Sequence, residues 1–392
     1  DLESPAAASR RRGGGGTELE SIRGVLGVHT VSGTGMGIEI LLDRNTEWLR
    51  GEGPDARIVV SSRVRLARNL RGFRFPGRAD AETRIRVREL VARAAEGSRL
   101  LQGALTVRLD EIGELDRQFL VERHLSSREH ARGDEGTALV IGDREILSLM
   151  VNEEDHLRIQ TLRSGFRLDA ALEEINRLDD EIEERLDYAF LPETGYLTSC
   201  PTNAGTGLRA SVMLHLPGLV MVEQINQVLQ AIAKLGLAVR GLYGEGTEAS
   251  GNLFQISNQV TLGMAETDIV ENLGKVIGQI VDYEKKAQES LFKRSLKALE
   301  DRVYRAYGLL TGARIITSKE TIELLSALKL GLDSRLIPLD LGTINELFIV
   351  TQPAHLQKLA GRELKPEERD VFRAELIRQR LGSGRNPDAG PR

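Results

Sequence analysis

Residues 199–210 have the sequence SCPTNAGTGLRA. It contains Cys200, the only cysteine among 392 residues, and Arg209, which enters an apolar run. Most solitary cysteines are small buried hydrophobic residues. Proline and glycines beside a cysteine and an arginine favour a functional loop over a packed core. The stretch alone does not decide between these interpretations, so the other segments must.

The composition predicts a globular protein of about two domains, because the chain is 41% hydrophobic and 28% charged. One cysteine excludes an intrachain disulfide and a thiolate zinc cluster, which favours a reducing, cytoplasmic compartment. The net charge of −5 argues against a general nucleic-acid-binding surface. No apolar stretch reaches the roughly 20 residues of a membrane-spanning helix. We therefore expect no direct nucleic-acid or membrane partner.

The two ends of the chain lack sustained hydrophobic periodicity. Residues 1–35 include three consecutive arginines and four consecutive glycines, and we expect a disordered leader there. Residues 36–56 resemble a short helical lead-in, so Met36 is a candidate for the natural start, which intact-mass analysis of the native protein would test. Residues 383–392 are expected to form a disordered tail.

Between these ends, the hydrophobic periodicity changes once along the chain. Short strand-like runs, such as 137–141, 145–151 and 210–216, alternate with helical stretches, such as 81–97 and 222–234, up to about residue 285. Beyond it the periodicity is helical and highly charged. We therefore predict an α+β catalytic domain over residues 57–288 and an all-helical domain over residues 289–382.

Four segments share one design, in which a strand ends in arginine or glutamate next to glycine or serine. These segments are 61–65, 153–158, 200–209 and 240–245. If they converge, five guanidinium groups surround at least two carboxylates, and they repel one another unless a polyanion lies between them. The five arginines are Arg63, Arg65, Arg158, Arg209 and Arg240.

A triphosphate is the natural occupant of such a cluster. Arg63 and Arg65 share one face of their strand, whereas Val64 points into the core. No Walker A sequence and no kinase-type Gly-rich loop with a paired lysine is present, so arginines would have to bind the phosphates. The competing interpretation is that each arginine is a surface residue with a local salt-bridge partner.

Four motifs together resemble the ATP:guanido phosphotransferases, the phosphagen kinase family. They are SSRVR at 61–65, NEEDHLR at 152–158, CPTNAGTG at 200–207 and RASV at 209–212. The resemblance covers about residues 55–290 and implies an antiparallel-sheet catalytic domain flanked by helices. It also implies ATP and Mg²⁺, with no protein ligand of the metal that we can name.

Within this family the chain is similar to the bacterial branch that phosphorylates arginine residues of proteins. Only 60 residues precede Ser61, so we expect a site open enough for a protein side chain. The sequence GEGTEA at 244–249 resembles that branch's nucleotide loop. The sequence RDVFRA at 369–374 matches its Arg-Asp-x-x-Arg-Ala motif. That resemblance implies an allosteric phosphoarginine pocket formed by Arg369, Asp370, Arg373 and Ala374.

The resemblance also assigns roles to individual residues. Glu154 and Glu245 would hold the guanidinium and take up its proton, while Arg158, Arg209 and Arg240 stabilise the transferring phosphoryl group. Cys200 would tune the guanidinium without forming a covalent intermediate. The residues implied at the nucleotide are Ser61, Ser62, Arg63, Val64, Arg65, His124, Arg158, Arg209, Ala210, Ser211, Val212, Met213, Arg240, Gly241, Leu242, Tyr243, Gly244 and Glu245.

By the same resemblance, the enzyme would mark proteins for degradation during stress. Its expected partners are protein substrates including a heat-shock transcription repressor, an ATP-driven unfoldase-protease and a zinc-binding activator protein. The helical C-terminal domain would form a homodimer. Two alternatives stay open: a kinase of a free guanidino metabolite, and a phosphoarginine-binding adaptor with vestigial catalysis.

Overall fold

The computed structural model describes residues 37–44, 46–241, 250–333 and 336–382. The expected leader over 1–35, the candidate start Met36 and the expected tail over 383–392 lie outside the described residues. The chain from Ile38 onward is grouped as one compact unit. In the described part of the chain, no helix combines the length and apolar character needed to cross a membrane.

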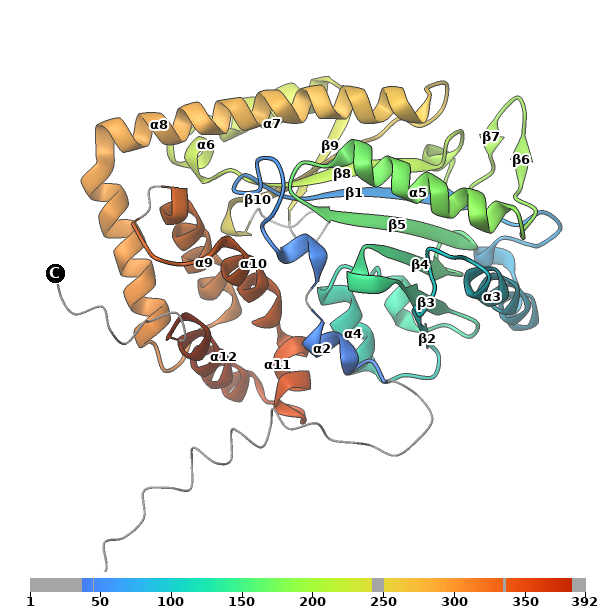
Figure 1. The fold of residues 1–392 in the computed structure, drawn as a ribbon, viewed down its shortest axis with the longest axis horizontal. Coiled ribbons are helices and arrows are strands. Elements are labelled where there is room, and N and C mark those ends of the chain that lie inside the picture. The colour runs from blue at the N-terminus through green and yellow to red at the C-terminus, as the bar shows by residue number, and fades with distance from the viewer. Residues whose placement is uncertain (1–36, 45, 242–249, 334–335, 383–392) are drawn as a thin grey trace, which may run out of the picture. The chain divides into compact units, whose positions relative to one another are not determined.

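The main architectural element is an antiparallel sheet. Its described strands follow the order β2-β3-β4-β5-β1-β8-β10-β9, and every neighbouring pair is antiparallel (Figure 1). This confirms the predicted antiparallel α+β fold class. The strands are β1 Val59–Arg68, β2 Leu105–Arg108, β3 Ala138–Ile141, β4 Leu147–Val151, β5 Leu157–Ser164, β8 Leu208–His215, β9 Leu237–Gly241 and β10 Leu253–Asn258, with a separate ribbon of β6 Phe190–Leu191 and β7 Gly195–Tyr196.

Helices precede, cover and follow the sheet. The lead-in contains the short helix α2 and a 3-10 turn, η1 (Glu47–Leu49). The described helices are α2 Ile40–Asp43, α3 Ala81–Glu96, α4 Glu114–Glu122, α5 Leu168–Glu183, α6 Pro217–Met221, α7 Ile225–Lys234, α8 Glu266–Gly312, α9 Ser318–Asp333, α10 Leu341–Val350, α11 Pro353–Ala360 and α12 Pro366–Gly382.

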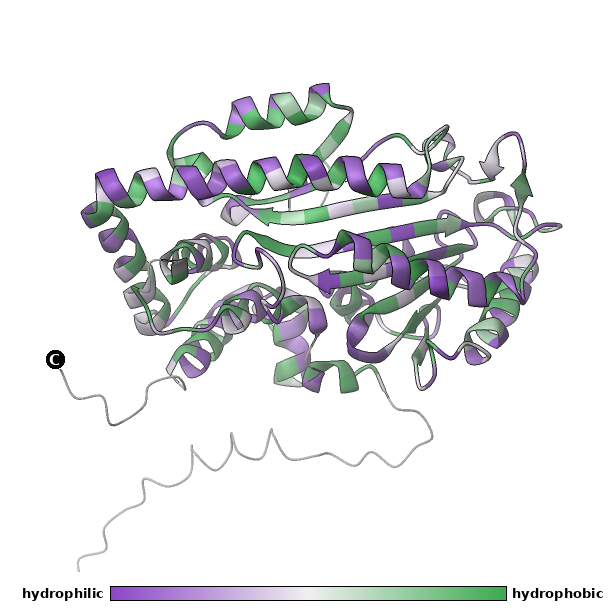
Figure 2. Cartoon of the chain, turned by 45° about the horizontal axis from the view of Figure 1, so that its top comes forward, coloured by the Kyte–Doolittle hydropathy of each residue, from purple (hydrophilic) through white to green (hydrophobic). Residues whose placement is uncertain are grey.

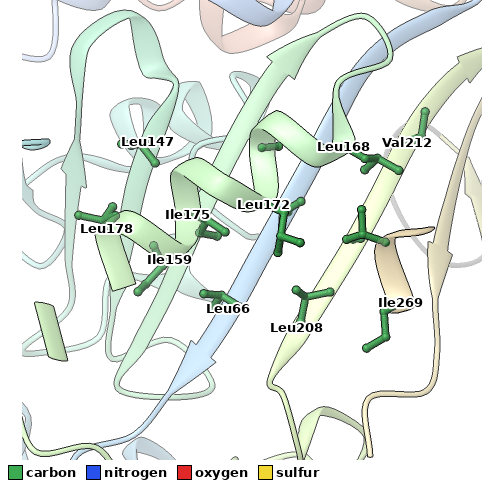
Figure 3. Close-up of a cluster of buried hydrophobic side chains, with 14 of the residues drawn as sticks. Leu66, Leu147, Ile159, Leu168, Leu172, Ile175, Leu178, Leu208, Val212 and Ile269 are labelled. Carbon is green, nitrogen blue, oxygen red and sulfur yellow. The ribbon is translucent and has the colours of Figure 1, made fainter. Parts of the chain in front are cut away.

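Helices α5 and α8 cover one face of the sheet. Figure 3 shows Leu172 and Ile175 of α5 above Leu66 of β1 and Ile159 of β5, with Ile269 of α8 beside Leu208. Each of these side chains is almost completely buried. Because side chains alternate along a strand, filling this face with apolar residues leaves the other face to the intervening positions. Arg63 and Arg65 of β1 occupy those positions.

The C-terminal helices form a second apolar core. The long helix α8 is banded with hydrophilic and hydrophobic residues (Figure 2), and its backbone departs from helical geometry at Ser295 (φ −139°, ψ 31°). The boundary expected after residue 288 falls inside this helix. Beyond Ser295, α8 packs with α9, α10 and α12, and this core also includes Trp48, Leu162 and Met213.

Two local predictions needed correction. The strand expected from Glu145 begins at Leu147, because Asp143–Glu145 form a 3-10 turn in which Glu145 has φ +60°. The helix expected over 222–234 begins later, as α7 at Ile225, because Glu223 has φ +59° and separates it from the short helix α6, which ends at Met221. In both places a left-handed residue interrupts a pattern that reads as continuous in the sequence.

Candidate active site

Strand alternation assembles the predicted arginines on one face of the sheet. In β1, Arg63 and Arg65 flank the fully buried Val64. Arg209 of β8 lies directly opposite Arg65, and Arg158 of β5 lies opposite the next residue of β1 that shares this face. Cross-strand partners project from the same side of a sheet. Four of the five arginines therefore lie together at the centre of the sheet.

Arg240 reaches the same face through the two neighbouring strands. It pairs with Gln255 of β10, which pairs with Met213 of β8, which in turn pairs with Ser61 of β1. Ser61 shares its face with Arg63 and Arg65. The second carboxylate expected here, Glu245, lies outside the described residues, as do Leu242, Tyr243 and Gly244.

The electrostatics of this cluster are unfavourable without a ligand. Burial and the positive charges of Arg158, Arg209 and Arg240 lower the pKa of Arg63 to about 9. Burial and neighbouring arginines also lower the pKa of Arg65 well below its usual value. The Nε atom of Arg65 is buried without a hydrogen-bond partner among the described residues. An unsatisfied donor among repelling cations fits a polyanion, such as a chain of phosphates.

A small cavity adjoins this cluster. His124, immediately after α4, has φ +60° and an imidazole ring 5.3 Å from that of Trp48 in an edge-on arrangement. Burial and the charge of Arg63 lower the pKa of His124 to about 3, so its ring is neutral. Its Nε2 atom has no hydrogen-bond partner among the described residues. The cavity is lined by Trp48, Ser61, Arg63, His124, Leu162, Ser211, Met213 and Gln255.

Two adjacent glutamates beyond β4 have different environments. Glu153 forms an ion pair with Arg158 at 2.7 Å and accepts a hydrogen bond from the Ser127 hydroxyl at 2.7 Å. Burial opposes its ionisation, but Arg158 and Ser127 lower the pKa of Glu153 to about 2. The Glu154 side chain is exposed, and partial burial together with Asp155 and Glu153 raises its pKa. Glu153 is thus a fixed counter-ion, whereas Glu154 is available to a ligand and better suited to accept a proton.

A hydrogen-bonded network attaches the Glu154 loop to the Cys200 loop. Asp155 Oδ1 accepts from Asn69 Nδ2 and from the backbone N–H of Ser199, both at 2.6 Å. The Ser199 hydroxyl donates to the carbonyl oxygen of Glu154 at 2.7 Å. Asn69 follows β1, so this network joins the end of the strand that carries the 61–65 motif to the Glu154 and Cys200 loops.

A buried arginine, Arg68, stabilises the Cys200 loop. Arg68 donates to the carbonyl oxygen of Thr206 at 2.9 Å and pairs with Asp179 at 2.6 Å, and its guanidinium lies 3.5 Å from the centroid of the Tyr196 ring. Gly207 has φ +67°, and a Cβ there would lie 2.6 Å from the carbonyl oxygen of Ala67. The glycine is therefore required for the loop to approach β1.

Cys200 lies at the surface end of this loop. Its side chain is partly buried, and its Sγ atom lies 2.9 Å from the Thr202 hydroxyl. The loop, β9 and α7 line an open pocket that also includes Arg209 and Arg240. The cysteine is thus next to the Glu154 loop and near the arginine face.

Within each strand motif, only every second residue faces the arginine cluster. Ser62, Val64, Ala210 and Val212 are fully buried on the opposite side, where Ser62 donates to the Gly165 carbonyl oxygen at 2.8 Å. Ser61, Ser211 and Met213 face the cavity beside Arg63 and His124. Gly241 is buried at the end of β9.

Several residues of the site were missed at the sequence level. Glu153 is adjacent to the predicted Glu154, and only the ion pair with Arg158 distinguishes them. Asp155 lies inside a motif, and Arg68 lies three residues after one; the burial of each side chain was the missing signal. Trp48 and Gln255 come from segments with no charged motif, so no sequence signal identified them.

The C-terminal motif is far more buried than its charge suggests. Arg373 is 2% exposed and donates to the carbonyl oxygens of Thr351 and Ile316, both at 2.9 Å. It also forms an ion pair with Asp370. Ala374 is buried, while Arg369 is partly buried at the start of α12. Arg373 thus joins α12 to the ends of two other segments of the helical region.

An antiparallel sheet with an arginine-lined anion site beside an exposed carboxylate defines a phosphoryl-transfer enzyme. The sequence profile described as ATP:guanido phosphotransferase, C-terminal catalytic domain, matches residues 86–287. The profile described as Protein-arginine kinase McsB C-terminal domain matches residues 296–391. The chain belongs to the ATP:guanido phosphotransferase family. The first match begins after the motif at 61–65.

Proteins named protein-arginine kinase resemble this chain over most of their length. That of Desulforamulus reducens is 51% identical over 86% of this chain and 96% of its own. That of Halothermothrix orenii is 48% identical, with 88% and 99% covered. That of Bacillus subtilis is 48% identical, with 86% and 94% covered.

Solved structures of guanidino kinases share the fold. The duplicated taurocyamine kinase from Schistosoma mansoni, with bound transition state analog components, has a TM-score of 0.54 and 29% identity. The match covers 58% of this chain and 33% of that duplicated chain. Lombricine kinase also has a TM-score of 0.54, at 23% identity, with 63% and 73% covered, and supports the fold alone.

Proposed function

We propose that this protein is a protein-arginine kinase, which transfers the γ-phosphoryl group of ATP to the guanidinium of arginine residues in proteins. The observation that carries the proposal is the face of converging arginines, where burial and mutual repulsion lower the pKa of Arg63 and Arg65, beside the exposed carboxylate of Glu154. The names of the relatives support the same activity.

In this reaction Glu154 is the base. A guanidinium is a poor nucleophile, because its lone pairs are delocalised and it stays protonated. Glu154 accepts hydrogen bonds from the substrate guanidinium, aligns one nitrogen with the γ-phosphate and takes up its proton. Its raised pKa supports this role. Glu245 is proposed as the second carboxylate of the clamp.

The arginines bind the phosphates and stabilise the charge of the transferring group. Arg63 lines the cavity beside His124, which suits the nucleoside end, and Arg65 is the next residue of β1 on the same face. Arg158, Arg209 and Arg240 suit the γ-phosphate. Mg²⁺ is proposed as the metal cofactor, and it would neutralise part of the charge of the phosphate groups. The orphaned Nε of Arg65 supports the fit of a phosphate chain. We propose no protein ligand for the metal.

Cys200 is proposed to tune the substrate guanidinium. Its loop is hydrogen-bonded to the Glu154 loop through Ser199, which supports a location beside the substrate. Replacing Cys200 by Ala should lower kcat without loss of ATP binding. Mass spectrometry that detects a phosphocysteine intermediate during turnover would contradict this role.

The wider role is also a proposal. We infer that phosphorylation marks proteins for an ATP-driven unfoldase-protease during cytoplasmic stress, with a heat-shock repressor among the substrates and a zinc-binding activator protein as regulator. The helical C-terminal region is proposed to form a homodimer and to bind phosphoarginine through Arg369, Asp370, Arg373 and Ala374. Arg373 and Asp370 pair with each other in α12, whereas Arg369, in the first turn of the helix, is only partly buried.

The decisive experiment presents two acceptors to the purified full chain with ATP and Mg²⁺. An unfolded, arginine-rich protein should acquire acid-labile phosphoarginine, detected by ³¹P NMR and by mass spectrometry under neutral conditions. Turnover of free L-arginine alone would favour a kinase of a guanidino metabolite. Phosphoarginine binding without ATP turnover would favour an adaptor. Either result would overturn the proposal.

A further inference from the structure

Glu122, which ends α4, and the two residues after it have three different sets of partners; Glu122 and Arg123 are buried, and His124 is partly buried. The first, Glu122, accepts hydrogen bonds from the backbone N–H groups of Ala354 at 2.9 Å and His355 at 3.0 Å. His355 Nδ1 donates to the same carboxylate at 2.8 Å. Ala354 and His355 begin α11, which lies beside α4 in Figure 1. A carboxylate of the catalytic region therefore caps a helix of the C-terminal region.

The second residue, Arg123, contacts the other ring nitrogen of His355. Its guanidinium pairs with the buried Glu145 and donates to the Thr46 hydroxyl at 2.5 Å. Its Nη1 atom lies 3.5 Å from His355 Nε2. Since His355 donates through Nδ1 to Glu122, its Nε2 accepts from Arg123, and a neutral imidazole satisfies both contacts. His355 is thus fixed between two successive residues of one backbone segment.

The third residue, His124, reaches the cavity beside the arginine cluster. Its backbone is left-handed, which is uncommon for a residue other than glycine and requires support from its surroundings. Gln160 Nε2 donates to its carbonyl oxygen at 3.0 Å, and its ring is edge-on to Trp48. Its backbone N–H donates to the carbonyl oxygen of Val121 at 2.9 Å, and Glu122 and Arg123 precede it directly in the chain. The orientation of the His124 ring therefore depends on what holds those two residues.

We propose that His355 is a positioning residue for the nucleotide site: with Glu122 it holds the end of α4 in the conformation that directs His124 toward the cavity. The C-terminal helical region thereby sets the affinity of the catalytic region for nucleotide. This inference rests on the proposed function in that the ligand of the site is ATP. His355 is not among the residues that line the cavity.

The same pair of helices offers a matched control. Lys358 of α11 forms an ion pair with Asp116 of α4 at 2.7 Å, in the first turn of α4 and away from His124. Replacing Asp116 by Asn weakens the attachment of α11 to α4 without altering Glu122, Arg123 or His124. If weaker affinity for ATP came only from looser docking of α11 on α4, it would be seen both in Asp116→Asn and in the His355 variants.

The experiment uses the full chain and its only tryptophan, Trp48, as an internal probe. ATP with Mg²⁺ is titrated while Trp48 fluorescence is followed, for wild type, Asp116→Asn, His355→Asn and His355→Phe. In His355→Phe we expect the Kd for ATP to rise about tenfold, a loss of ~1.4 kcal/mol in binding. The emission of the nucleotide-free protein should shift, because the ring beside Trp48 moves. His355→Asn keeps a donor for Glu122 and should retain most of the affinity.

Steady-state kinetics separates positioning from folding. For His355→Phe, KM for ATP should rise with the Kd, while kcat at saturating ATP changes little. Asp116→Asn should leave KM unchanged even where its Tm falls. If His355→Phe does not fold, Glu122→Gln takes its place with the same expectation. An unchanged Kd, or an equal rise in both the His355 and Asp116 variants, would overturn the proposal. ATP binding without phosphorylation of protein arginine would instead contradict the proposed function alone.

Discussion

The Asp155 carboxylate accepts the backbone N–H of Ser199 at 2.6 Å, and this contact brings together two segments that are 44 residues apart in the sequence. Glu154 precedes Asp155 and Cys200 follows Ser199, so one hydrogen bond makes the proposed base and the cysteine neighbours. A second bond, from the Ser199 hydroxyl to the Glu154 carbonyl oxygen, reinforces the arrangement. The acceptor end of the site is therefore organised before a substrate arrives, which is how positioning contributes to rate.

Replacing Asp155 by Ala should lower kcat strongly and the free energy of unfolding moderately. The substitution leaves the Asn69 amide and the Ser199 N–H without their acceptor, at a cost of about 1–3 kcal/mol in the free energy of unfolding. The Glu154 and Cys200 loops then separate, and kcat should fall by about 100-fold, the effect of a small displacement at a reacting centre. Asp155→Asn keeps an acceptor oxygen and should retain far more activity. Equal kcat losses in the two variants would contradict this explanation.

Replacing Glu154 by Gln should remove the base without affecting nucleotide binding. We expect kcat to fall by about 10²–10⁴, the usual contribution of a general base, with the KM for ATP unchanged. Glu153→Gln is the matched control, because it removes a charge from the adjacent residue and leaves Arg158 without its ion pair. That control should lower stability and alter the KM for ATP while reducing kcat less. The opposite order of kcat losses would mean that the two carboxylates have been assigned the wrong roles.

Replacing Arg63 by Met should stabilise the nucleotide-free protein. Removing one of several repelling charges should raise the free energy of unfolding by about 1 kcal/mol, the order of one like-charge interaction at the effective dielectric of a partly buried site. The same change should abolish the stabilisation by ATP and Mg²⁺ that wild type shows. Urea unfolding with and without nucleotide measures both effects. A variant less stable than wild type in the absence of nucleotide would show that the cluster is not under electrostatic strain.

Stability should fall with pH below about 6.5, the ordinary pKa of histidine. Burial lowers the pKa of His124 to about 3 and the pKa of His130 and of His156 to about 4. Between these values and 6.5 the unfolded chain binds protons that the folded protein does not. Each histidine therefore removes about 1.4 kcal/mol of stability per pH unit as the pH falls through this window. Above about pH 6.5 this contribution to the free energy of unfolding is fully present.

The urea midpoint at pH 7, 6 and 5 measures this dependence. His156→Gln removes one of these buried histidines, so its midpoint should change less steeply with pH than that of wild type. Since Gln can still donate to the Arg74 carbonyl oxygen that His156 Nε2 contacts at 3.0 Å, the fold should persist. A midpoint that does not change between pH 7 and 5 would contradict the neutral, buried state of these histidines.

Local patterns in the sequence were sufficient for much of the fold. Alternation predicted that Val64 would be buried between Arg63 and Arg65, and the structure has this arrangement. The hairpin of β3 and β4 was also predicted, apart from its turn. The interruption at Glu223 was not, because a single left-handed residue leaves the hydrophobic period almost unchanged. Turn geometry of this kind depends on packing that the local sequence does not describe.

What the sequence determined by itself is the chemistry: the arginines, the carboxylates and the strand-end motifs that carry them, because residue type and period-two alternation are local properties. Only the tertiary structure decided which groups meet. Glu153, not Glu154, neutralises Arg158; Arg68, although it ends the same strand as Arg65, is buried against Asp179 below the site; and Trp48, from the lead-in, lines the cavity. These partners are set by strand register and burial, which arise only when distant segments pack together.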